Sequence, residues 1–217
     1  MAESLDAKKS RALRIVRSLE KAYPGAKIAL EFVNPLELLV ATILAAQCTD
    51  ERVNMVTRDL FKKYRTARDY AEADLATFES EIHSTGFYKA KAKAILGMAR
   101  VLVQQHGGQV PRTVEELMAL PGVGRKTANV VVGNAYGQQA IAVDTHVFRV
   151  SQRLGLARSD DPEKIHDQLC RVLPRGKWTR ITHLLTTHGR RVCQARAPAC
   201  PACPIRALCP WPWKSVA

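Results

Sequence analysis

The sequence predicts an all-α fold, and three observations lead to this prediction. Helix-capping residues recur along the chain, each before a segment of helical length. One long amphipathic segment, 89–105, is followed after one residue by Gly107-Gly108, as at a helix C-terminus. The one strand-like run, Val130–Val132, lies between a helix start and Gly133-Asn134 and has no partner strand. We therefore interpret that run as the interior of a helix.

The first clear helix start lies at Asn34-Pro35, where an N-cap residue precedes a proline at the first helical position. The segment 36–46 that follows is apolar on nearly every face, so we expect it at the centre of a helical unit. It contains Glu37 and is too short to cross a membrane.

The later helices are predicted from the same kinds of signal. Thr113 with Glu116 forms a capping-box pattern, and Gly107-Gly108 is typical of a helix end. The predicted helices run from Thr49-Asp50 to 64, over 89–105, from Thr113 to 120, from Thr145 onward, from Asp161-Pro162 onward, and over 177–190.

Charge and length restrict the classes of function. At 217 residues the chain can bury one large core or two small ones. The formal net charge is +13, and the segment 168–217 contains no Asp or Glu. The positive electrostatic field of such a segment favours binding of a polyanion such as nucleic acid. Charge alone also fits a generally soluble basic protein. Nine basic residues lie in that segment: Arg171, Arg175, Lys177, Arg180, Arg190, Arg191, Arg196, Arg206 and Lys214.

A glycine-rich turn opens a helix at Gly122-Val123-Gly124-Arg125-Lys126. The helix macrodipole disfavours a cation in the first turn by roughly 0.3–1 kcal/mol, so Lys126 is either a surface residue without function or an amine driven towards its neutral form. Asp144 follows the apolar run 141–143, eighteen residues further on. An amine nucleophile with a nearby carboxylate suits Schiff-base chemistry on a sugar. The alternative for Asp144 is an N-cap of the helix that begins at the next residue.

Four cysteines near the C-terminus form a candidate metal site. The N-terminal residues do not have the pattern of an export signal, so we expect no export, and this expectation argues against disulfides, which belong to oxidising compartments. Zinc and an iron–sulfur cluster both accept four thiolates, and the spacing C-x6-C-x2-C-x5-C does not decide between them. Cys48 and Cys170 lie outside this group and are expected to be small buried apolar residues. The four candidate ligands are Cys193, Cys200, Cys203 and Cys209.

Several motifs together resemble the endonuclease III family of helix-hairpin-helix DNA glycosylases, which carry a [4Fe–4S] cluster. Each motif alone is moderately specific, whereas all of them in this order are highly specific. The resemblance runs from about Asn34 to Cys209 and favours iron–sulfur over zinc. It rests on the hairpin 120–129, the segment 141–150, the four-cysteine spacing, Leu44-Ala45-Ala46-Gln47-Cys48-Thr49-Asp50 and Gly86-Phe87-Tyr88-Lys89.

The resemblance implies an all-α architecture of two helical lobes flanking a DNA-binding cleft. One lobe would be a helical bundle over 28–137 that holds the hairpin. The other would combine 1–27 with 138–217 and bear the cluster. The expected partner is double-stranded DNA with a damaged pyrimidine or an abasic site. We expect a monomer of bacterial type in the cytoplasm, associated with the nucleoid and with no membrane contact.

The resemblance also implies a base-excision-repair enzyme that removes oxidised or reduced pyrimidines. Lys126 would attack the sugar C1′, and the Schiff base formed would lead to strand cleavage by β-elimination. Asp144 would accept the lysine proton and stabilise positive charge on the sugar. Adenine-specific relatives carry an extra carboxylate in the early apolar helix, and 38–46 contains none, so adenine excision is not expected.

Further residues are implied to contact DNA. Gln47 and Phe87 would fill the gap left by a flipped nucleotide, although Phe87 stands where the family often has leucine. Without the resemblance, Phe87 would be interpreted as core packing. The hairpin residues Gly122, Gly124 and Arg125 would bind the phosphate backbone, and Arg196 lies between the first two cysteine ligands. Two alternatives to the repair enzyme remain open, namely a DNA-binding module without catalytic activity and an iron–sulfur electron carrier.

We predict that DNA affinity falls steeply with salt. Contacts to about six to ten phosphates release counterions, so affinity should drop by orders of magnitude between about 50 and 200 mM salt. A titration of a fluorescent duplex at several salt concentrations measures this slope. A flat dependence would contradict the assignment of the basic C-terminal surface to DNA.

Overall fold

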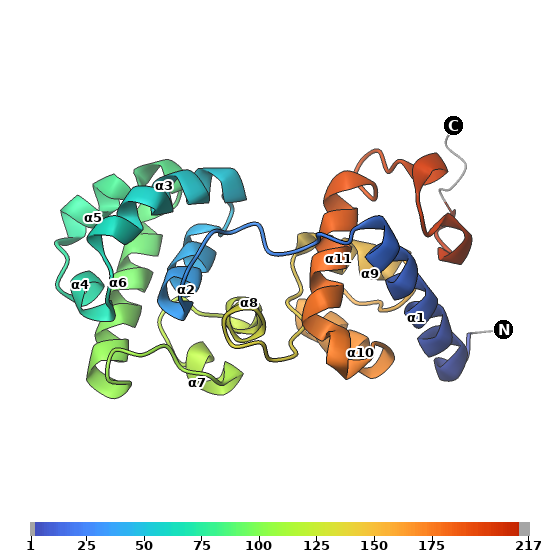
Figure 1. The fold of residues 1–217 in the computed structure, drawn as a ribbon, viewed down its shortest axis with the longest axis horizontal. Coiled ribbons are helices and arrows are strands. Elements are labelled where there is room, and N and C mark those ends of the chain that lie inside the picture. Colours follow the sequence, from blue (N-terminus) through green and yellow to red (C-terminus); the bar gives the residue numbers. More distant parts are fainter. Residues whose placement is uncertain (1–2, 213–217) are drawn as a thin grey trace. The chain divides into compact units, whose positions relative to one another are not determined.

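The computed structural model describes residues 3–212, and every regular element in that range is a helix (Figure 1). The predicted all-α class is therefore confirmed. The chain divides into two compact units, here called unit 1 (Met1–Ile28 with Gln139–Ala217) and unit 2 (Ala29–Gln138). Lys214 of the basic segment lies outside the described residues. None of the described helices is both long and apolar enough to span a bilayer.

Unit 2 is continuous in sequence and is built around one apolar helix, α2. Its elements are α2 (Pro35–Leu44), α3 (Asp50–Lys63), α4 (Ala67–Ala71), α5 (Leu75–Glu81), the 3₁₀ helix η1 (His83–Thr85), α6 (Tyr88–Gln105), α7 (Val114–Met118) and α8 (Arg125–Ala135). Helix α2 packs against α3, α6 and α8, and Leu36 and every residue from Leu38 to Leu44 are buried. Burying one such leucine stabilises the fold by about 1.5–3 kcal/mol, which explains the central position of this helix.

The predicted helix starts agree with the structure. Asn34 caps α2 by accepting a 2.9 Å hydrogen bond from the Glu37 amide, and Thr49 caps α3 in the same way. The run Val130–Val132 lies inside α8, as predicted. The predicted helix ends are less accurate than the predicted starts. Helices α2 and α7 each end two residues before the predicted positions, which were 46 and 120.

The two short helices α4 and α5 were not predicted. Thr66 and Asp69 form a complete capping box at the start of α4, and Asp74 caps α5. These residues are a signal that could have revealed both helices. Each helix is only five or seven residues long, so it lacks the repeated apolar spacing by which longer helices are recognised.

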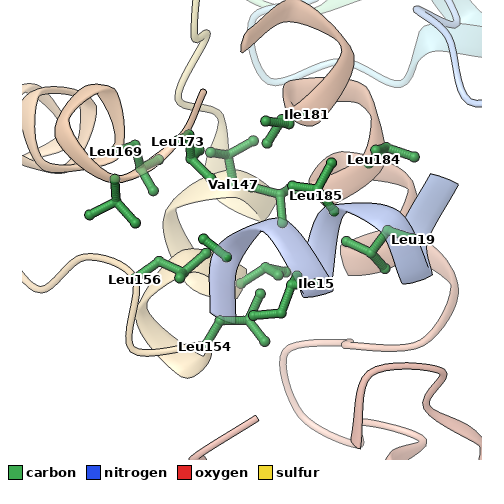
Figure 2. Packing of buried hydrophobic residues seen from close by; sticks show 14 of the residues in the cluster. Ile15, Leu19, Val147, Leu154, Leu156, Leu169, Leu173, Ile181, Leu184 and Leu185 are labelled. Carbon is green, nitrogen blue, oxygen red and sulfur yellow. The ribbon is translucent and has the colours of Figure 1, made fainter. Parts of the chain in front are cut away.

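Unit 1 joins the two ends of the chain in one core. Its elements are α1 (Leu5–Ala22), α9 (Thr145–Arg153), α10 (Pro162–Val172), the 3₁₀ helix η2 (Arg175–Lys177), α11 (Trp178–Arg191), and the 3₁₀ helices η3 (Cys200–Ala202) and η4 (Arg206–Leu208). Figure 2 shows Ile15 and Leu19 of α1 among the leucines of the later helices. Asp161 caps α10 and Asp144 caps α9, both as predicted.

Polar contacts also hold α1 against the C-terminal helices. The Arg180 guanidinium donates to the backbone oxygens of Tyr23, Pro24 and Ala26 just after α1. Lys177 forms an ion pair with Glu20 at 2.7 Å. The first helix is therefore fixed by residues more than 150 positions away in the sequence.

Candidate functional site

The turn between α7 and α8 depends on glycine at position 122. Gly122 has a φ of 74°, and the turn closes with a hydrogen bond of 3.2 Å from the Val123 amide to the Leu120 oxygen. A Cβ at Gly122 would lie 2.5 Å from the Ala94 Cβ in α6. Glycine is therefore required both by the left-handed backbone and by the close approach to α6.

The N-terminus of α8 has no side-chain cap and no acidic residue in its first turn. Gly124 is the N-cap residue and is exposed, Arg125 is half-buried, and Lys126 is exposed. The first amides of a helix have no partner within the helix, and they carry partial positive charge. With two cations added, this helix end is suited to bind an anion such as a phosphate.

Asp144 is held by two hydrogen bonds within unit 1. Its Oδ1 accepts from the Val147 amide at 2.7 Å, which makes Asp144 the N-cap of α9. Its Oδ2 accepts from the Thr186 hydroxyl at 3.0 Å. The capping interpretation of Asp144 is thus correct, and the same contacts orient the half-buried carboxylate. Thr186 was not predicted, because it lies 42 positions from Asp144 and no sequence signal links two residues so far apart.

Close packing of α9 against α11 brings Thr186 to Asp144. A Cβ at Gly189 would lie 2.8 Å from the His146 Cβ, so only glycine allows this approach. Burial lowers the pKa of His146, and Asp144 opposes this shift. His146 also lies 3.1 Å from an Arg149 nitrogen through its Nδ1. These contacts fit a structural role for His146.

Gln47 and Phe87 share an unusual backbone conformation. Of the non-glycine residues that the structure describes, only these two have positive φ, at 53° and 49°. Such left-handed residues cost on the order of 1–3 kcal/mol each and cluster at functional sites. Both side chains are exposed, and Phe87 retains 65% of its accessible surface. The core-packing interpretation of Phe87 is therefore excluded.

The four candidate cysteine ligands line one cavity of unit 1 together with Arg153 and His188. Arg153 donates to the Cys193 sulfur at 3.4 Å, and His188 Nε2 lies 3.7 Å from the Cys203 sulfur. No Asp or Glu is among the described lining residues, and burial raises the pKa of the Cys203 thiol. Within 3–212, no three His, Cys, Asp or Glu side chains are already placed to hold a metal ion. Arg196 is exposed in the loop between the first two cysteines.

The two remaining cysteines lie outside this cavity. Cys48 and Cys170 are half-buried rather than fully buried. Burial raises the pKa of Cys170 to about 11, so its thiol stays protonated and unreactive at neutral pH.

Comparisons with known proteins point in one direction. Residues 40–175 match the family profile of HhH-GPD superfamily base excision DNA repair proteins. The chain is 50% identical over 204 residues to endonuclease III of Synechocystis sp., covering 94% of this chain and 93% of that protein. It is 40% identical over 201 residues to endonuclease III of Escherichia coli K12, covering 93% and 95%.

Solved structures give the same result. A non-covalent endonuclease III–DNA complex matches with a TM-score of 0.89 at 46% identity, covering 93% of this chain and 95% of that chain. A trapped endonuclease III–DNA covalent intermediate matches with the same TM-score, identity and coverage.

We predict opposite effects for alanine at two glycines that lie where the hairpin packs against α6. Gly122→Ala should destabilise unit 2 by more than about 1 kcal/mol, because it adds a Cβ where φ is positive and space is absent. Gly97→Ala should stabilise it by about 0.5–1 kcal/mol, because Gly97 is helical and its Cβ would meet Pro121 at an ordinary 3.6 Å. Urea unfolding of the two variants measures both; equal effects would contradict the packing at Gly122.

Proposed function

Because the chain belongs to the endonuclease III family within the HhH-GPD superfamily of base excision DNA repair proteins, we propose that it is a bifunctional DNA glycosylase and abasic-site lyase. Its substrates are oxidised or reduced pyrimidines in duplex DNA. The observation that carries this proposal is an exposed lysine at an uncapped helix N-terminus in the hairpin. A relative of 46% identity is known as a trapped covalent intermediate with DNA.

In the proposed reaction the Lys126 amine attacks C1′ of the damaged nucleotide, and the bond from C1′ to the base breaks. The base leaves with its electron pair and takes up a proton from water, while one amine proton passes to Asp144. As the sugar ring opens, its ring oxygen takes up a proton, and a protonated imine forms between Lys126 and C1′. The imine acidifies the C2′ proton. Removal of this proton expels the 3′ phosphate oxygen, which cleaves the strand by β-elimination.

Asp144 is the proposed acceptor of the lysine proton. The Val147 amide and the Thr186 hydroxyl each engage one oxygen of its carboxylate, so its orientation is fixed before substrate arrives. A carboxylate held in this way also stabilises positive charge that develops on the sugar as the base departs. We propose that Thr186 contributes by positioning Asp144 and not by contact with DNA.

The DNA-contacting residues are proposed from exposure and charge. Gly122, Gly124 and Arg125 surround the uncapped end of α8 and would bind backbone phosphate. Gln47 and Phe87 would enter the stack after the damaged nucleotide is flipped, which itself costs a few kcal/mol. The exposed Phe87 ring offers a larger stacking surface than leucine. Arg196 is proposed as a further phosphate contact.

The four cysteines of unit 1 are proposed to hold a [4Fe–4S] cluster. The donor set fits, since four sulfurs line one cavity with N–H donors and no described carboxylate beside them. When bound, the cluster supplies a cross-link that fixes the loops between Cys193 and Cys209. We propose that the protein acts as a cytoplasmic, nucleoid-associated monomer on duplex DNA.

We predict that borohydride traps a covalent adduct between this protein and a duplex that carries thymine glycol. The reduction converts the Lys126 imine into a stable amine, so Lys126→Ala should abolish the adduct. Lys62→Ala is the matched control, because Lys62 is an exposed lysine of α3 that pairs with Asp59 at 2.8 Å. Binding of each variant to an uncleavable abasic analogue checks that the fold is intact.

An undiminished adduct with Lys126→Ala would assign the nucleophile to another residue. A wild-type protein that binds the lesion but forms no adduct, even on an abasic site, would indicate a binding module instead of a lyase.

We also predict that anaerobically purified protein contains about four iron atoms and about four sulfides per chain. Cys203→Ser should lose both iron and visible absorbance, because one thiolate ligand is removed. Cys170→Ser should retain them, since Cys170 lies outside the cavity. Stoichiometric zinc without iron would contradict the assignment of the cluster.

A further inference from the structure

Lys91 of α6 is a buried cation. It is 5% exposed, and it is the only Lys or Arg that is buried within residues 3–212. Lysine is almost never buried without partners, because removing its charge from water is costly. Burial lowers the pKa of Lys91, and the nearby Cys48 opposes the shift. A residue of this kind needs a specific explanation.

The partners of Lys91 are two backbone oxygens at helix ends. Its Nζ donates to the Leu44 oxygen at 2.7 Å and to the Thr85 oxygen at 2.9 Å. Leu44 is the last residue of α2, and Thr85 is the last residue of η1. The carbonyl oxygens of the last turn of a helix accept no hydrogen bond from within the helix, and they carry partial negative charge. One ammonium group therefore satisfies both ends.

Each of these helix ends leads directly into one of the strained residues. Gln47 comes three residues after Leu44, and Phe87 comes two residues after Thr85. The α6 helix that carries Lys91 begins at Tyr88, and the Lys91 amide donates to the Phe87 oxygen at 3.1 Å. Lys91 thus forms hydrogen bonds at the base of both loops, although it lies 47 positions from Leu44 in the sequence.

We propose that Lys91 is a positioning residue that fixes the loops of Gln47 and Phe87 relative to each other, so that both side chains enter the DNA stack together. This inference rests on the proposed function of those two residues. Lys91 itself is too buried to touch DNA. Its effect is preorganisation, because loops that are already in place lose less conformational freedom when the duplex is opened.

The test separates opening of the duplex from chemistry. Lys91→Met keeps a long unbranched side chain but removes both hydrogen bonds. Excision of thymine glycol from a duplex under single-turnover conditions should fall by about 10- to 100-fold, as expected when reacting groups are misplaced by about 1 Å. Borohydride trapping on a single-stranded abasic oligonucleotide needs no wedge, so it should stay within about twofold of wild type.

Lys93→Met is the matched control, since Lys93 is an exposed lysine of the same helix. It removes the same charge but neither hydrogen bond, so it should preserve the ratio of duplex excision to single-strand trapping. A double-mutant cycle with Phe87→Ala gives a second readout. If Lys91 acts through the wedge, Lys91→Met should have a much smaller effect on excision in the Phe87→Ala background.

Several results would overturn this inference. One is an unchanged rate of duplex excision by Lys91→Met, and another is an equal loss of duplex excision and of single-strand trapping. A third is full additivity of the effects of Lys91→Met and Phe87→Ala on excision. If Lys91→Met does not fold, Lys91→Arg replaces it, because Arg retains a cation with N–H donors. Its ratio of duplex excision to single-strand trapping should lie between the ratios of wild type and Phe87→Ala. If borohydride traps no adduct of the wild type on the duplex or on the single-stranded oligonucleotide, the proposed function is overturned, and this inference with it.

Discussion

Every helix leaves amides at its first turn and carbonyls at its last turn without a partner in the helix. In a protein built only of helices across its described residues, these groups must be met by caps, by buried cations or by ligands. Most ends here are met by ordinary caps such as Asn34, Thr49 and Asp161. Several ends that lack such caps lie at or beside residues proposed to act on DNA. The uncapped start of α8 is offered to a phosphate, and the carbonyls that end α2 and η1 are met by the ammonium of Lys91.

Each unit carries some of the residues to which the proposed function gives a role. Unit 2 supplies the nucleophile Lys126, the hairpin and the two strained residues that would fill the DNA stack. Unit 1 supplies Asp144 and the cysteine cavity. In each unit a glycine permits a close approach that the function uses. Gly122 brings the hairpin against α6, and Gly189 brings α11 against α9 so that Thr186 reaches Asp144.

The sequence predicted the helical class and most helix starts, because caps are local signals that read directly from residues such as Asn34-Pro35. It also indicated Asp144 as a cap, which the structure confirms. What it could not predict are contacts between distant positions, since no local rule links Thr186 to Asp144 or Lys91 to Leu44. The left-handed backbone of Gln47 and Phe87 was equally hidden, because neither residue type favours that conformation. The roles of Lys126 and the four cysteines in chemistry remain predictions.

The division of unit 1 between the two ends of the chain has a consequence for how the protein is made. As the chain leaves the ribosome, α1 emerges before unit 2 but can pack against its partners only after α9, α10 and α11 have been synthesised. Unit 2 is continuous, so all of its helices are available before the second part of unit 1 exists. Domains generally fold as units during synthesis, so unit 2 can fold before unit 1, although α1 of unit 1 is synthesised before unit 2. The apolar face of α1, with Ile15 and Leu19, lacks its core partners until the C-terminal helices have been synthesised, so this face is exposed to solvent for most of the time that synthesis takes.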